Sequence, residues 1–124
     1  MKEVKISKEL FNEVTDSKCH EVFIKDEFII AHSNLGMKMV NIYEFAFIKC
    51  KEWSMNKGYQ IISGLSDEPA YRNQDEKAYA QLRYYIEDEN GNGEYEDKYF
   101  MANTEIEAVV KASEYILKEI NENR

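Results

Sequence analysis

The sequence has few cysteines, histidines and prolines and no long apolar run, and these shortages exclude several classes of protein. Two cysteines cannot form the disulfide framework of a small secreted domain, and two histidines leave little material for a metal or acid–base site. The longest apolar runs, such as residues 28–31, are too short to span a bilayer, so no membrane partner is expected. The charged N-terminus lacks a signal-peptide core, which favours a cytoplasmic location.

What the chain does contain is typical of one globular domain. Its length of 124 residues and its 13% aromatic content suffice for a packed core, and no linker interrupts residues 1–124. Within this domain we distinguish an N-terminal segment, residues 1–40, from a core of residues 41–121. A pI near 4.8 argues against direct nucleic-acid binding, which needs a cationic surface.

The negative charge is concentrated in one stretch of the chain, residues 66–105. There, eleven acidic residues face four basic ones, a net charge of −7, whereas residues 1–65 contain nine of each sign. Such a concentration creates a local field that a basic partner would feel. The sequence therefore says more about a partner than about chemistry.

Hydrophobic spacing predicts two long helices. Asn41 is a suitable N-cap for a helix over residues 42–57, and Gly58 a suitable residue to end it. Thr104 and Glu107 have the spacing of a capping box that opens a second helix, residues 104–121. The first helix is apolar on nearly every side, which indicates that it is covered on more than one side.

Alternating and β-branched stretches predict the strands of an α+β fold. Between the helices we expect strands at 59–63, 77–87 and 94–102, the last two joined by a turn at Asn90–Gly93. They would form an antiparallel sheet with both long helices packed on it, and residues 64–76, which include Pro69, an exposed loop.

The first forty residues predict a smaller unit. Ser7 is placed to cap a short helix through Leu10, Phe11 and Val14. Strands at 21–25 and 28–33 would then form a hairpin, followed by a turn into residues 37–40.

Two apolar residues of the first long helix, Ile48 and Met55, fall on its outward side among charged residues. We expect them either to mediate self-association as a homodimer or to be covered by a terminal segment of the chain.

Three patterns that suggest metal or thiol chemistry are better explained without it. The stretch from Asp88 to Gly93 resembles the start of a calcium loop, but Tyr99 stands where the bidentate glutamate should be. Cys19, His20, His32 and Cys50 could in principle bind zinc or form a thiol–base pair. Their spacing matches no familiar site, and Cys50 lies on an apolar helical face. We therefore expect no metal, no cofactor, no catalytic residues and no enzymatic activity.

The clustering of tyrosines within the acidic stretch is the sequence feature that points to a function. Six of the nine tyrosines lie in residues 66–105, where their rings could anchor an interface while carboxylates steer the partner. The residues predicted to bind the partner are Tyr85, Asp88, Glu89, Glu94, Tyr95, Glu96 and Asp97.

Two stretches resemble a group of small proteins from phages and prophages of AT-rich bacteria. One runs from Glu44-Phe45-Ala46 through Cys50-Lys51-Glu52-Trp53 to Lys57-Gly58-Tyr59, and the other from Thr104-Glu105-Ile106-Glu107-Ala108 to Lys111-Ala112-Ser113-Glu114-Tyr115. The resemblance covers about residues 41–121 and implies a helix, three strands and a helix. It also implies a mobile-element setting, in which small acidic proteins often antagonise host nucleic-acid-binding defence systems.

The leading functional hypothesis is a non-enzymatic inhibitor that binds a basic, nucleic-acid-handling host protein by occupying a groove meant for phosphates. The alternative is a small-molecule binding or sequestering protein. Its pocket, between sheet and helices, would be lined by Tyr43, Trp53, Tyr84 and Tyr115.

Overall fold

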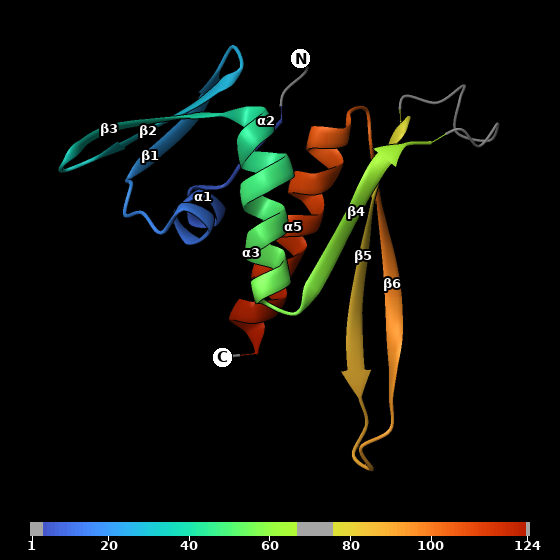
Figure 1. The fold of residues 1–124 in the computed structure, drawn as a ribbon. Coiled ribbons are helices and arrows are strands. Elements are labelled where there is room, and N and C mark those ends of the chain that lie inside the picture. The colour runs from blue at the N-terminus through green and yellow to red at the C-terminus, as the bar shows by residue number, and fades with distance from the viewer. Residues whose placement is uncertain (1–3, 67–75, 124) are drawn as a thin grey trace.

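A computed structural model describes residues 4–66 and 76–123, and it confirms the α+β prediction: one small domain with two three-stranded antiparallel sheets and helices (Figure 1). The elements in chain order are α1 (Lys8–Thr15), β1 (Glu21–Lys25), β2 (Phe28–Ser33), β3 (Gly36–Asn41), α2 (Ile42–Glu44), the π-helix η1 (Phe45–Cys50), α3 (Lys51–Asn56), β4 (Tyr59–Leu65), β5 (Ala78–Glu87), β6 (Gly93–Ala102) and α5 (Glu105–Glu122). Most of the loop predicted at 64–76, Pro69 included, lies outside the described residues. No helix in the described part of the chain is long and apolar enough to cross a membrane.

The N-terminal unit is a short helix followed by a three-stranded meander. Ser7 caps α1 as predicted, because its hydroxyl accepts a hydrogen bond from the backbone N–H of Leu10 at 3.0 Å. The Ser7 hydroxyl also donates to Glu114 Oε1 at 2.7 Å, which ties the segment to α5. Strands β1, β2 and β3 pair in sequence order, so the predicted hairpin gains a third strand.

The predicted helix over 42–57 is one continuous helix with a π-helical middle. Asn41 caps it by accepting from the backbone N–H of Tyr43 and Glu44, and Gly58 ends it at a φ of +89°. A π-turn brings residues five apart toward the same side of a helix. Phe45 and Cys50 are therefore both fully buried, which a regular α-helix would not allow on a single narrow face.

The C-terminal sheet, in the order β4–β5–β6, carries α5 on one face. The Thr104 hydroxyl accepts from the backbone N–H of Glu107 at 3.2 Å, which confirms the predicted start of this helix. The helix over 42–56 lies beside α5 and reaches this sheet where α3 runs into β4 (Figure 1). The helix α5 is thus the central element of a core to which both halves of the chain contribute.

The β5–β6 hairpin is longer than the helix that covers it. Along the covered face of β5, burial falls from complete at Leu82 through partial at Tyr84 to a 42% exposed side chain at Ile86. Pairing nevertheless continues to Glu87 and Gly93. The hairpin therefore projects beyond the helices as a two-stranded arm (Figure 1).

Candidate interaction surface on the β5–β6 hairpin

The strand register divides the predicted partner-binding residues between two faces of the hairpin. Tyr85 pairs directly with Tyr95 and Arg83 with Asp97, so these four side chains share the face turned away from α5. We call it the outer face. Glu94 and Glu96 alternate with these residues and belong to the opposite face of β6, where they pair with Ile86 and Tyr84.

On the outer face, the Arg83 guanidinium lies over the ring of Tyr95. The Arg83 guanidinium carbon lies 4.8 Å from the centre of the Tyr95 ring, and its Nε lies 3.9 Å from Asp97 Oδ1. The Gln81 amide donates to the same carboxylate oxygen at 3.1 Å. Asp97 is therefore already engaged within the sheet, and Arg83 partly neutralises it.

The two predicted tyrosines form an edge-to-face pair, with ring centres 5.4 Å apart and planes at 67°. The Tyr85 ring also lies directly over Gly93, where it occupies the space that a Cβ atom would need. An aromatic ring over a strand glycine shields the backbone and fixes the ring. Both rings nevertheless remain more than half exposed, Tyr85 by 52% and Tyr95 by 64%.

The turn of the hairpin is held by Asp88. Its Oδ1 accepts hydrogen bonds from the backbone N–H groups of Asn90 and Asn92, both at 2.9 Å, while Gly91 adopts a φ of +80°. This is how Asp organises its own turn. The turn spans residues 88–92, and the role of Asp88 in it is structural as well as electrostatic.

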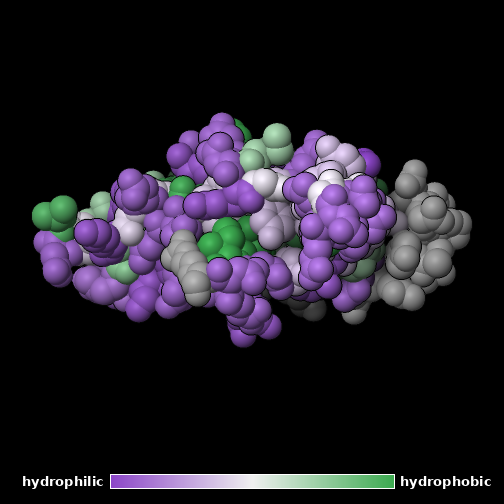
Figure 2. Space-filling view, turned by 90° about the horizontal axis from the view of Figure 1, so that it is seen from below, coloured by the Kyte–Doolittle hydropathy of each residue, from purple (hydrophilic) through white to green (hydrophobic). Residues whose placement is uncertain are grey.

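The remaining carboxylates give the end of the hairpin its charge. We define the hairpin end as residues 84–96, which contain five acids and no cation, a net charge of −5. Of these acids, four make no ion pair or hydrogen bond through their side chains with the described residues: Glu87, Glu89, Glu94 and Glu96. Seen from below, the hairpin end points at the viewer as a mainly hydrophilic surface (Figure 2).

The structure thus brings six of the seven predicted residues to the hairpin end and shows Asp97 just beyond it, paired with Arg83. Two further residues of this surface, Glu87 and Arg83, were not among the seven predicted ones. Glu87 was detectable as an acid next to the turn, whereas the role of Arg83 depends on its cross-strand register with Asp97.

The residues proposed for a small-molecule pocket do not gather around one cavity. Tyr43 and Trp53 are ten residues apart on one helix, which separates them by about 15 Å along its axis. Tyr43 packs on Phe47 and stays 41% exposed, whereas Trp53 is buried and its indole N–H finds no acceptor among the described residues.

Tyr84 and Tyr115 do come together, in an aromatic cluster with Tyr59 and Phe100. Burial raises the pKa of Tyr115 to about 12, and the negative charge of Glu119 contributes to the rise. A phenol in this setting stays neutral at physiological pH, so the cluster acts as part of the core rather than as an acid–base group.

The thiols belong to the core. Cys50 is fully buried, and this burial raises the pKa of its thiol to about 12, which keeps it protonated and unsuited to nucleophilic attack. Cys19 is also buried, and Asn12 holds its backbone N–H and C=O at 2.8 and 2.9 Å. No group of three potential metal ligands occurs among the described residues.

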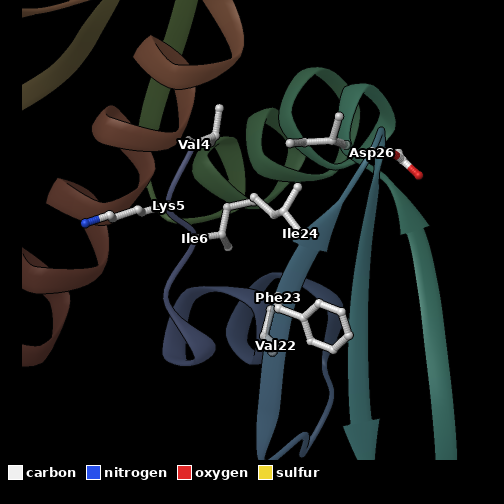
Figure 3. A pocket seen from close by; sticks show the side chains of 8 residues that line it. Val4, Lys5, Ile6, Val22, Phe23, Ile24 and Asp26 are labelled. Atoms are coloured by element: carbon white, nitrogen blue, oxygen red, sulfur yellow. The ribbon is translucent and has the colours of Figure 1, made fainter. Parts of the chain in front are cut away.

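A groove of about 700 Å³ lies between the N-terminal segment and β1. Its lining is mixed: Ile6 and Ile24 face one another, the Lys5 ammonium is directed away from them, and Asp26 lies at the end of β1 (Figure 3). It offers no set of polar groups converging on one point, which a specific small-molecule site requires.

Ile48 and Met55, predicted to mediate self-association, remain 52% and 59% exposed. The described N-terminal segment therefore does not cover them, and self-association through this spot stays a prediction.

Comparison with models of known protein families, with curated proteins and with solved structures found no match for this chain.

Proposed function

We propose that this chain is a non-enzymatic interaction protein that binds a basic, nucleic-acid-handling protein through its hairpin end and thereby competes with nucleic acid. The observation that carries the proposal is the projecting end itself, with five acids, no cation and both faces accessible. A surface groove that binds phosphates would be attracted to such an arm, because long-range charge attraction steers association.

Rings and carboxylates would have different tasks in such an interface. The four unpaired glutamates need no rearrangement before they meet lysines or arginines of a partner, and they act chiefly on the association rate. Tyr85 and Tyr95 are rigid, partly exposed rings of the kind enriched at interface hot spots, and they act chiefly on dissociation. A phage or other mobile-element origin, in which the partner is a host defence protein, agrees with this role.

The test compares two variants with the same loss of charge. The hairpin variant carries Glu87→Gln, Glu89→Gln, Glu94→Gln and Glu96→Gln. The control variant carries Glu9→Gln, Glu27→Gln, Glu44→Gln and Glu52→Gln, all exposed acids elsewhere in the fold. Wild-type protein and both variants are immobilised and exposed to a bacterial lysate, and captured proteins are identified by mass spectrometry.

We expect to capture a protein that binds the wild type and the control variant equally well but does not bind the hairpin variant. A labelled DNA or RNA duplex should then compete for that partner, and binding should weaken as salt rises from about 50 to 500 mM. The proposal would be contradicted if both four-fold variants lost partner binding equally, or if nucleic acid did not displace the captured partner. Tyr85→Ala and Tyr95→Ala should raise the dissociation rate of the identified partner.

A further inference from the structure

The N-terminal sheet has one face in the core and one face that no described element covers. Ile29 and Ala31 of β2 point into the core and are fully buried. The alternate residues form the opposite face, which we call the apolar face. Its apolar members, all but Ile30 at least 39% exposed, are Phe23, Phe28, Ile30, Met37 and Met39.

The apolar residues of this face are contiguous across the three strands. The register places Phe23, Ile30 and Met39 in one row across the three strands. His32 stacks on Phe23, with ring centres 6.0 Å apart. Contiguous exposed apolar residues of this kind mark a contact surface.

Two opposite charges stand at the two ends of β1 on this face. Glu21 and Lys25 flank Phe23 at equal spacing, since both lie two residues from it. Neither makes an ion pair with the residues that the structure describes. A surface with a cation at one end and an anion at the other is complementary to its own copy turned end for end.

We propose that the apolar face binds a second copy of this chain, in a two-fold dimer in which the two N-terminal sheets pack face to face. The two-fold axis lies in the interface, crosses the strands at the Phe23–Ile30–Met39 row, and makes the two copies of β1 antiparallel. Each Glu21 then meets Lys25 of the second copy, and each apolar row faces its own copy. Such an isologous arrangement is the commonest form of protein oligomer.

The charge distribution of the whole molecule favours this occupant. Residues 1–65 contain as many basic as acidic residues, so the two N-terminal units do not repel one another. The hairpin end, where the negative charge lies, is at the opposite side of the molecule from the N-terminal sheet (Figure 1). A dimer through the apolar face therefore separates the two acidic arms and leaves both free.

The size of the face sets the expected affinity. Three strands of about six residues present roughly 14 by 20 Å, or about 300 Å², which is less than the usual contribution of one partner to a standard interface. We therefore expect a micromolar, concentration-dependent dimer.

The experiment is sedimentation velocity of the full chain from about 1 to 200 µM, a range chosen to span a micromolar dissociation constant. Wild type should shift from monomer to dimer. Phe23→Glu and, independently, Met39→Lys should remain monomeric, and circular dichroism should show that both keep their fold because the replaced side chains are exposed. Ile48→Asp, a matched change on the rival spot, should dimerise like wild type.

Charge reversal tests the orientation. Glu21→Lys or Lys25→Glu alone creates two like-charge contacts across the two-fold axis and should weaken the dimer about three- to tenfold. The double variant should recover the affinity of wild type. A wild type that stays monomeric, or a dimer lost in Ile48→Asp but kept in Phe23→Glu, would overturn the proposal. Failure of the double variant to recover would overturn the two-fold arrangement.

These outcomes are separable from those for the hairpin. Phe23→Glu leaves residues 84–96 intact and should still bind a partner of the hairpin end, whereas the four-fold hairpin variant should still dimerise.

Discussion

The two sheets of this molecule have the same topology and opposite outward surfaces. Each is a three-stranded antiparallel meander in sequence order with one face in a shared core. The uncovered face of β1–β2–β3 presents phenylalanine and methionine with few charges, whereas that of β4–β5–β6 presents tyrosines and the Arg83–Asp97 pair.

Folding needs only the inward faces, because burial of their aliphatic side chains supplies the stability. Neither outward face is required for that purpose, and the two differ in composition. The two outward faces therefore differ in character: one is mainly apolar, and the other is aromatic and polar.

The largest expected effect separates inward from outward residues on both sheets. Ile29→Ala and Leu82→Ala remove fully buried side chains, one from each sheet, and should each lower the free energy of unfolding by about 2–5 kcal/mol. Met39→Ala and Tyr99→Ala, on the outward faces, should cost about 1 kcal/mol or less. Urea unfolding at low protein concentration measures all four. An outward substitution as costly as an inward one would show that the face is covered in the monomer.

The next effect concerns the helix that joins the two sheets. Burial raises the pKa of the Cys50 thiol from 9 in the unfolded chain to about 12 in the fold. The thiol is therefore neutral in both states below pH 9, and between pH 9 and 12 it ionises mainly in the unfolded chain. Stability is therefore intact at neutral pH and should fall by about 2 kcal/mol by pH 10.5 through this group. Cys50→Ala should lose less stability than wild type over that interval, as measured by urea unfolding. A parallel fall in both proteins would contradict the assignment.

A smaller effect is expected at the glycine under Tyr85. In Gly93→Ala the new methyl group takes the place of the Tyr85 ring, which must swing away and lose its contact with Tyr95. The cost should be about 0.5–1.5 kcal/mol, the usual value of an aromatic pair. When Gly93→Ala is introduced into a protein that already carries Tyr85→Ala, its cost in stability should be almost zero, since no ring remains to be displaced. Equal costs in both backgrounds would refute this role of the ring.

The smallest effect is expected at the unpaired glutamates. The four-fold hairpin variant should keep its melting temperature within a few degrees, because exposed carboxylates contribute little to stability. Asp88→Ala should cost about 1 kcal/mol, because the backbone N–H groups of Asn90 and Asn92 lose their acceptor. Asp88→Asn retains an acceptor oxygen and should lie between the two. Scanning calorimetry ranks the three proteins.

Local signals in the sequence were enough to predict most elements of the fold. Ser7, Asn41 and Thr104 cap the helices that they were expected to cap, since a capping side chain acts on the N–H groups next to it. The turn after Glu87 could likewise be predicted, because its asparagines and glycines act on their own backbone. The π-turn at Phe45–Cys50 was not, because it depends on which side of the helix the rest of the core occupies.

The sequence predicted which residues belong to the site but not how they are divided between the two faces of the hairpin. Composition alone shows that acids and tyrosines gather near the turn. That Glu94 and Tyr95 lie on opposite faces, and that Arg83 holds Asp97, follows from a strand register set by long-range pairing. How far the hairpin projects past α5 likewise depends on where the helix ends against the sheet, and no local sequence pattern determines that position.

Because no described helix covers the end of the arm, its length can change without altering the core. Beyond Tyr84 the hairpin is held by its own ladder rather than by the helix, so strands can grow or shrink there without disturbing the core. Because side chains alternate with a period of two, inserting one residue on each strand moves the turn outward and presents the residues beyond the insertion on exchanged faces. Inserting two on each strand lengthens the arm and preserves those faces. Insertion of one residue on each strand therefore changes both the length and the surface pattern of the arm, whereas insertion of two changes its length alone.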